Sequence, residues 1–275
     1  SVKTNSALVR KRIRDTRMKV EEYQSGVRSN TTIQILYIED LVHEELLEEV
    51  KNRLEEYKID GILDSGMLEQ LTEDSWFSPF PQYQTTERPD RAAQEILNGK
   101  AVLLCDNSPS ALILPGVFHS FMESSEDWYN RFEMASFLRI LRYVALAAAT
   151  LLPGLYLAVI RFHTQILPTN MLLSFAQARE GVPFSSIAEL VLLELSFELI
   201  REAGVRIPGA LGNAMGIVGG LIVGSAAVEA NLVSPIVVMV VAITALGSLA
   251  IPNEEFASAF RMLKYFFLFL GGYLG

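Results

Sequence analysis

The sequence predicts an α/β domain with a small, mostly parallel sheet, followed by an all-α membrane domain with several spans. Charged residues are frequent before Tyr143 and sparse after it, and hydrophobic residues make up 50% of the chain. That fraction is high for a soluble protein and suits a protein that lies partly in a membrane. A strand–helix–strand pattern in the charged part is typical of a βαβ unit, which favours a parallel sheet.

We expect three segments: a basic connector over residues 1–26, a soluble α/β domain over residues 27–123, and a helical membrane domain over residues 124–275. The chain starts with Ser and ends in an apolar run, so we expect a fragment truncated at its C-terminus. Lys3–Lys19 holds seven basic residues against Asp15 alone. Such an arm could contact nucleic acid, acidic lipid or an acidic partner, but we favour a solvated connector helix. No motif supports nucleic-acid binding.

The α/β domain is predicted from alternating strand-like and helix-like patterns. β-branched and aromatic residues indicate strands, a one-sided apolar stripe indicates a helix, and Asp64 can cap a further helix. The expected elements are strands over Thr31–Ile38 and Ile59–Leu63, helices over Glu44–Tyr57, Met67–Leu71 and Thr86–Asn98, and a β-hairpin of Lys100–Cys105 with Ser110–Leu114.

Long apolar runs predict the membrane domain. Ile207–Val228 and Ala230–Asn253, separated by Glu229, are each long enough to cross a bilayer core of about 30 Å. Tyr143–Ile160 is an earlier span, which we expect Pro153 to kink, and a helix is expected to lead into it from Ser124. Ile166–Ala178 is too short to span and is either re-entrant or interfacial. Basic residues before Tyr143 place the soluble part in the cytoplasm.

Small residues recur at helical spacing in the first of these runs. Gly212, Gly216, Gly220 and Gly224 form successive G-x-x-x-G pairs. In lipid, helices pack closely over small residues. The glycine face therefore predicts helix packing, either within one subunit or between subunits.

Three carboxylates form a line on a predicted helix over Ser185–Glu202. Glu194, Glu198 and Glu202 are spaced four residues apart. An amphipathic helix at the membrane surface, with its carboxylates in water, is the interpretation that we favour. The alternative is a helix whose acidic stripe faces a watery pore and concentrates cations.

Residues for other chemistry are sparse. The three histidines are scattered, Cys105 is the single cysteine, and the sequence has no P-loop, nucleophile elbow or dinucleotide fingerprint. We therefore predict no enzyme activity, no cofactor and no metal site, and we expect Cys105 to be a buried structural thiol.

Several motifs resemble a known family in the same order along the chain. They are Thr4–Ile13, Ile59–Gly66, Ser78–Gln82, Thr86–Asp90, Ser136–Tyr143, Arg179–Phe184, Arg201–Gly204 and Ala250–Pro252. The whole chain is similar to the A subunit of the GerA family of spore germinant receptors. A SpoVAF-like accessory ion channel is the second choice within the superfamily.

The resemblance implies a multi-pass protein of the inner spore membrane, with its soluble domain on the core side. Its implied partners are a transporter-like B subunit, a lipoprotein C subunit and copies of itself in a ring, which forms a nutrient-gated channel for monovalent cations. A secondary transporter and a non-conducting membrane scaffold remain alternatives from other classes. Which germinant is sensed, how many subunits assemble and which helix lines the pore stay open.

Four pore-lining candidates come from the residues and not from the family. Thr244 and Ser248 would supply polar lining on a helix over Ser234–Pro252, while Glu194 and Glu198 would form a vestibule. Alternatively, Thr244 and Ser248 only hydrogen-bond to carbonyls of their own helix.

Overall fold

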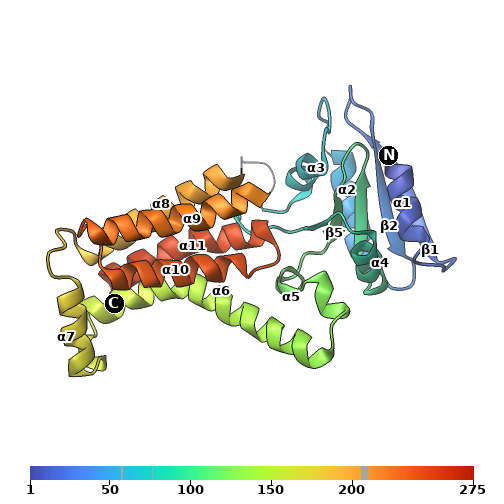
Figure 1. Cartoon of the computed structure of the whole chain (residues 1–275). Coiled ribbons are helices and arrows are strands. Elements are labelled where there is room, and N and C mark those ends of the chain that lie inside the picture. The colour runs from blue at the N-terminus through green and yellow to red at the C-terminus, as the bar shows by residue number, and fades with distance from the viewer. Residues whose placement is uncertain (57, 76, 206–209) are drawn as a thin grey trace. The chain divides into compact units, whose positions relative to one another are not determined.

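The computed structural model describes residues 1–56, 58–75, 77–205 and 210–275, with only the backbone described at 205, 210–218 and 221. The chain divides into two compact units, which we describe separately: an N-terminal unit, Ser1–Asn130, and a helical unit, Arg131–Gly275. Figure 1 labels their elements.

The N-terminal unit contains an antiparallel sheet, so the prediction of a mostly parallel sheet was wrong. Its five strands lie in the order β1-β2-β4-β5-β3, and every neighbouring pair is antiparallel. The predicted hairpin of the last two strands in sequence is confirmed as β4 and β5. The strands are β1 (Met18–Ser25), β2 (Thr31–Ile38), β3 (Gln84–Thr86), β4 (Ala101–Cys105) and β5 (Ala111–Leu114).

The predicted second strand of a βαβ unit, Ile59–Leu63, is not a strand. Its backbone instead binds the β1–β2 turn: Val27 N donates to Ile59 O over 2.8 Å, and the Thr31 hydroxyl donates to Ile62 O over 2.6 Å. The turn requires Gly26, which has φ +89° and whose added Cβ would lie 2.2 Å from the Ser29 hydroxyl. The hairpin therefore forms from strands adjacent in sequence, and the described strands make no parallel crossover.

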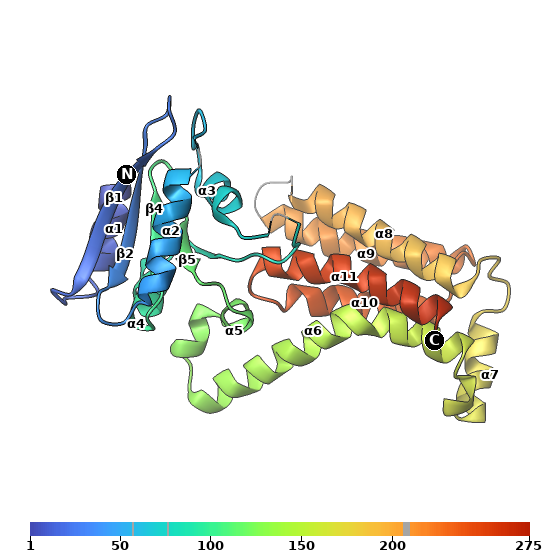
Figure 2. The same ribbon diagram turned by 180° about the vertical axis from the view of Figure 1, so that it is seen from behind.

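Helices cover both faces of this sheet, as Figure 2 also shows. β2 alternates between two cores: Ile33 and Ile35 pack with α2 and α3, while Leu36 and Ile38 pack with α1 and α4. Residues 1–26, predicted as a connector, supply α1 and the edge strand β1 to this fold. The helices are α1 (Val2–Arg10), α2 (Glu44–Glu56), α3 (Ser65–Thr72), α4 (Pro89–Leu97), α5 (Phe118–Met122) and the 3-10 turn η1 (Ser125–Trp128).

The start of α4 holds the last segment of the N-terminal unit. Arg91 donates to Ser120 O over 3.2 Å, and the Tyr129 hydroxyl donates to Asp90 over 2.7 Å. The Arg88 guanidinium, together with the Tyr129 hydroxyl, holds the pKa of Asp90 well below its usual range. These contacts fix the chain just before the helical unit begins.

In the described residues, the regular elements of the helical unit are all helices. The expected helix from Ser124 is interrupted: Ser124 caps η1, and α6 starts only after Arg131. The elements are α6 (Phe132–Arg161), the 3-10 turn η2 (Thr164–Ile166), α7 (Thr169–Ala178), α8 (Ser186–Val205), α9 (Ala210–Glu229), α10 (Pro235–Leu249) and α11 (Glu254–Tyr273). Both views show α6 bending along its length, and Pro153 lies within it.

The apolar core of this unit joins four helices. Leu157 of α6, Leu193 of α8, Val241 of α10 and Leu268 of α11 are fully buried in one cluster. A buried aliphatic side chain of this kind contributes about 1.5–3 kcal/mol. The four helices therefore form one packed body.

Among the described residues, α6 is the helix that is long and apolar enough to cross a membrane. Its 30 residues reach about 45 Å, which exceeds a bilayer core of about 30 Å. α10 is apolar but has 15 residues. In the part of the chain that the structure describes, length and hydropathy together support a membrane span for α6. The start of the predicted span Ile207–Val228 lies outside the described residues.

Candidate functional site

A network of charged and hydroxyl side chains lies between α8, α10 and α11. α8 supplies the carboxylates of Glu194 and Glu198, which are one helical turn apart and so share a face. α10 supplies hydroxyls, and α11 supplies basic side chains. We call this set the charge network: Glu194, Glu198, Arg201, Thr244, Ser248, Arg261 and Lys264.

Glu194 lies at the buried end of the network. It is 2% exposed, and the Lys264 ammonium, itself on a residue 5% exposed, donates to its Oε2. The Thr244 hydroxyl lies 3.0 Å from Oε1 and can donate to it. Both Glu194 oxygens therefore have polar partners within the chain.

Glu198 is half-buried and is shared among three basic groups. Its Oε1 lies 3.6 Å from Arg261 Nε and 3.8 Å from Lys264 Nζ, and its Oε2 lies 4.0 Å from Arg201 Nε. Three long contacts indicate a diffuse charge cluster instead of one bidentate pair. Lys264 thus bridges the two carboxylates of α8.

The predicted hydroxyls of α10 are both buried. Arg201 Nη2 donates to the Ser248 hydroxyl over 2.9 Å, and that hydroxyl donates to Ala245 O over 2.8 Å. Thr244 Oγ1 also lies 2.8 Å from Val241 O. Ser248 therefore bonds to its own helix and to Arg201 of α8 together, whereas the single Thr244 proton can go to either Val241 O or Glu194 Oε1.

The structure brings the four pore candidates into one network, joined by three basic residues, of which sequence reasoning missed the two on α11, Arg261 and Lys264. Arg201, Arg261 and Lys264 supply the opposite charge. A signal for two of them exists: Arg261 and Lys264 interrupt an apolar helix at a spacing of three, much as the carboxylates interrupt α8 at a spacing of four. Complementary charges in two apolar helices favour a direct pairing.

A second buried carboxylate, missed by sequence reasoning, holds the start of α10. The Glu189 side chain is fully buried, and its oxygens accept from Arg179 Nη2 over 3.0 Å and from Ser234 N over 2.9 Å. Ser234 in turn caps α10 by accepting from Val237 N. Glu189 therefore joins α8 to the segment after α7 and to α10.

The described glycines of the predicted packing face contact helices of the same chain. A Cβ on Gly220 would lie 2.8 Å from the Phe197 ring of α8, and one on Gly224 would lie 3.2 Å from Val238 of α10. The surroundings of Gly212 and Gly216 lie outside the described side chains. Gly220 and Gly224 therefore allow close packing against helices of their own chain.

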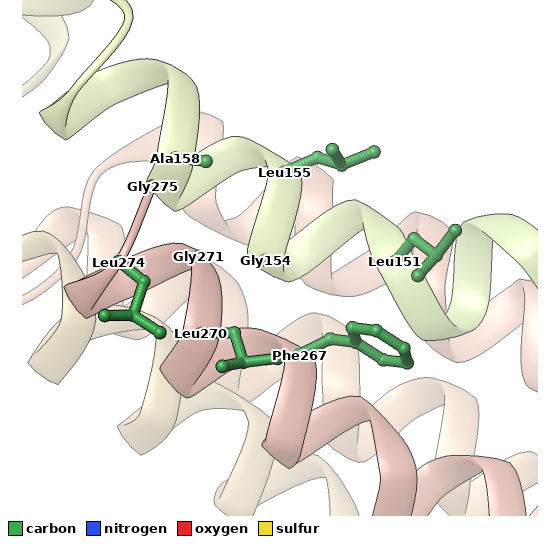
Figure 3. Close-up of a pocket in the computed structure, with 9 residues that line it drawn as sticks. All are labelled: Leu151, Gly154, Leu155, Ala158, Phe267, Leu270, Gly271, Leu274 and Gly275. Carbon is green, nitrogen blue, oxygen red and sulfur yellow. The ribbon is translucent and has the colours of Figure 1, made fainter.

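An apolar groove of about 340 Å³ lies along the crossing of α6 and α11 (Figure 3). A Cβ on Gly271 would lie 2.1 Å from Gly154 O, so the two backbones approach closely. The groove is lined by Leu151, Gly154, Leu155, Ala158, Phe267, Leu270, Gly271, Leu274 and Gly275.

Together these features define a class of protein: a small antiparallel α/β unit followed by a helical unit with a membrane-compatible helix and internal charges. The sequence profile described as Bacillus/Clostridium GerA spore germination protein matches residues 1–275. The chain belongs to the GerA family, which confirms the resemblance drawn from the motifs. It is not an enzyme family.

Several relatives match all or nearly all of the chain. It is 41% identical over 275 residues to spore germination protein KA of Bacillus subtilis strain 168, covering 100% of this chain and 51% of the relative. The uncharacterized membrane protein YfkQ of the same strain is 41% identical, covering 100% and 54%. Spore germination protein GerLA of Bacillus cereus is 40% identical, covering 97% and 54%. The chain spans about half the length of these curated relatives.

A solved structure from the same kind of protein also matches part of the chain. The crystal structure of the N-terminal domain of the A subunit of the Bacillus megaterium spore germinant receptor GerK3 is 36% identical in sequence. It covers 43% of this chain and 94% of that chain, with a TM-score of 0.35.

Proposed function

We propose that this chain is part of the A subunit of a spore germinant receptor, which assembles with copies of itself into a nutrient-gated channel for monovalent cations. Relatives named as spore germination proteins and as a receptor A subunit support the receptor role. In this proposal the receptor lies in the inner spore membrane, the helical unit crosses it more than once, and the N-terminal unit faces the spore core. The partners are a transporter-like B subunit and a lipoprotein C subunit.

The observation that carries the channel proposal is the charge network. Ionisable side chains inside an apolar helical domain are costly, and they commonly mark an ion pathway or the element that controls one. Glu194 and Lys264 are both nearly inaccessible, yet lie among apolar helices. A purely structural core would be equally well filled by apolar side chains.

Ion flux from reconstituted receptor tests the proposal. The full-length A subunit would be co-reconstituted with its B and C subunits in potassium-loaded vesicles, and potassium release would be followed after a panel of amino acids and sugars is added. We expect release that depends on one nutrient and on the A subunit. Coupled, saturable solute uptake without independent ion release would instead indicate a transporter, and co-purification without any flux would indicate a scaffold.

A further inference from the structure

We propose that Lys264 is a tethered countercharge: its ammonium fills the cation position of the α8 carboxylates and keeps free monovalent cations out of it. The inference deepens the proposed channel function and rests on it for its physiological meaning. The cation position that Lys264 fills is defined by contacts within this chain alone.

The position has the ligands that a monovalent cation prefers. Oxygen atoms of two carboxylates, Glu194 Oε2 and Glu198 Oε1, face the Lys264 ammonium, and the Thr244 hydroxyl lies against the other Glu194 oxygen. A hard cation binds carboxylate and hydroxyl oxygens in the same way. An ammonium is a compact point charge on a flexible stem, so it can occupy such a position while its alkyl chain packs among apolar side chains.

Burial strengthens the ion pair between the Lys264 ammonium and the Glu194 carboxylate. Glu194 and Lys264 are 2% and 5% exposed, so little water competes for either charge. An unpaired carboxylate in such a place is strongly disfavoured, and it must regain a cation, take up a proton or pull the helices apart. Removing the ammonium while keeping the carboxylates should therefore create a binding site for an added cation.

The other basic residues do not fill the same position. Arg261 approaches Glu198 at 3.6 Å, and Arg201 is directed to Ser248 as well as to Glu198. Among the described residues, Lys264 is the basic residue that forms an ion pair with Glu194. Lys264 is thus the residue whose loss exposes the carboxylate pair.

Thermal stability in two salts tests the inference without any ion flux. The Tm of the full-length protein in detergent at pH 8 would be measured in potassium chloride and in choline chloride at equal concentration. The proteins compared are wild type, Lys264→Met, Lys264→Arg and the double variant Glu194→Gln with Lys264→Met. A ligand that binds only the folded state raises its Tm. We expect potassium to raise the Tm of Lys264→Met by about 2–4 °C over choline when the cation is about fivefold above its dissociation constant.

The matched variants are expected to show no difference between the two salts. Lys264→Arg keeps the countercharge, and the double variant lacks the buried Glu194 carboxylate, which leaves Glu198 alone at the position. If Lys264→Met folds poorly, the yield of monodisperse protein purified in potassium relative to choline replaces the Tm. Equal Tm values, or equally poor yields, in the two salts would overturn the inference.

A measurement of potassium flux distinguishes this inference from the proposed function. In vesicles without nutrient, potassium leak through Lys264→Met should exceed that of wild type several-fold. A salt-dependent Tm of Lys264→Met, with no ion flux from any variant even when nutrient and partners are present, would contradict the channel proposal and support the cation position. Nutrient-dependent ion flux from wild type, with no effect of the salt on the Tm of Lys264→Met, would support the channel proposal and contradict the cation position.

Discussion

Glu189 and Glu194 are both buried on α8, yet their partners differ in kind. Glu194 is paired with an ammonium 70 residues away, whereas Glu189 combines the guanidinium of Arg179 with the backbone N–H of Ser234. A carboxylate that accepts from a backbone N–H at a helix start also opposes the positive end of the helix dipole. Glu189 is therefore a structural joint between α8 and the start of α10, while Glu194 belongs to a network made of side-chain charges and hydroxyls.

The joint predicts a stability loss when its charge is removed. Glu189→Gln should lower the free energy of unfolding by about 1–3 kcal/mol, because Arg179 and the start of α10 lose a charged acceptor. Arg179 is partly exposed, so water limits the loss. Thermal denaturation of the full-length protein measures the change.

Glu229→Gln is the matched control, since Glu229 is an exposed carboxylate of the same unit. Its effect should stay within about 0.5 kcal/mol. Equal Tm changes for the two variants would contradict the assignment of Glu189 as a joint.

At the scale of elements, the crossing of α6 and α11 is set by backbone approach. Gly154 lies next to Pro153, and a Cβ there would lie 2.5 Å from Phe267 O. Arg161 near the end of α6 donates to Gly272 O over 2.6 Å, which fixes the far side of the same crossing. Two backbone-to-backbone contacts and one cap therefore hold these helices in register.

Gly271→Ala should disturb this crossing, because its methyl group would lie 2.1 Å from Gly154 O and backbone cannot rotate away. Overpacking of this kind costs about 1–3 kcal/mol. Gly224→Ala is the control: its methyl group would meet a Val238 methyl at 3.2 Å, where the neighbour has to yield by only a few tenths of an ångström. Cooperative melting of the two variants in detergent should separate them, and equal Tm values would argue against a tight crossing.

At the scale of the whole molecule, the chain consists of two compact units with separate cores. The single cysteine, Cys105, lies in β4 within the N-terminal core and is 1% exposed. Burial raises the pKa of the Cys105 thiol to about 11, so the folded unit holds it as an unreactive thiol. The expectation of a buried structural thiol agrees with this placement.

Cys105 therefore reports the N-terminal unit alone. In a denaturant titration, thiol labelling should follow the unfolding of this unit, while Gly271→Ala should lower only the midpoint of the helical unit. Circular dichroism at 222 nm and thiol labelling on the same samples give the two midpoints. A shift of both midpoints by the same amount would mean that the units unfold together.

The sequence by itself determined much of the element pattern and the family. The α3 cap at Asp64, the stop of α4 before Gly99 and the β4–β5 hairpin follow from local signals, because caps, left-handed glycines and short turns act within a few residues. The break near Glu229 between two apolar helices is equally local. Motifs in order along the chain were enough to predict the family.

Only the tertiary structure decided the direction of the sheet and the surroundings of the acidic stripe. β1 could be recognised only through its pairing with β2, since its polar sequence, with Lys19, Glu21 and Glu22, carries the same local signal as a solvated connector. Likewise, a line of carboxylates on α8 looks the same whether water, a pore or Lys264 faces it. The physical reason is that local spacing fixes which residues share a face, whereas the partner of that face comes from a residue 70 positions away, brought there by helix packing.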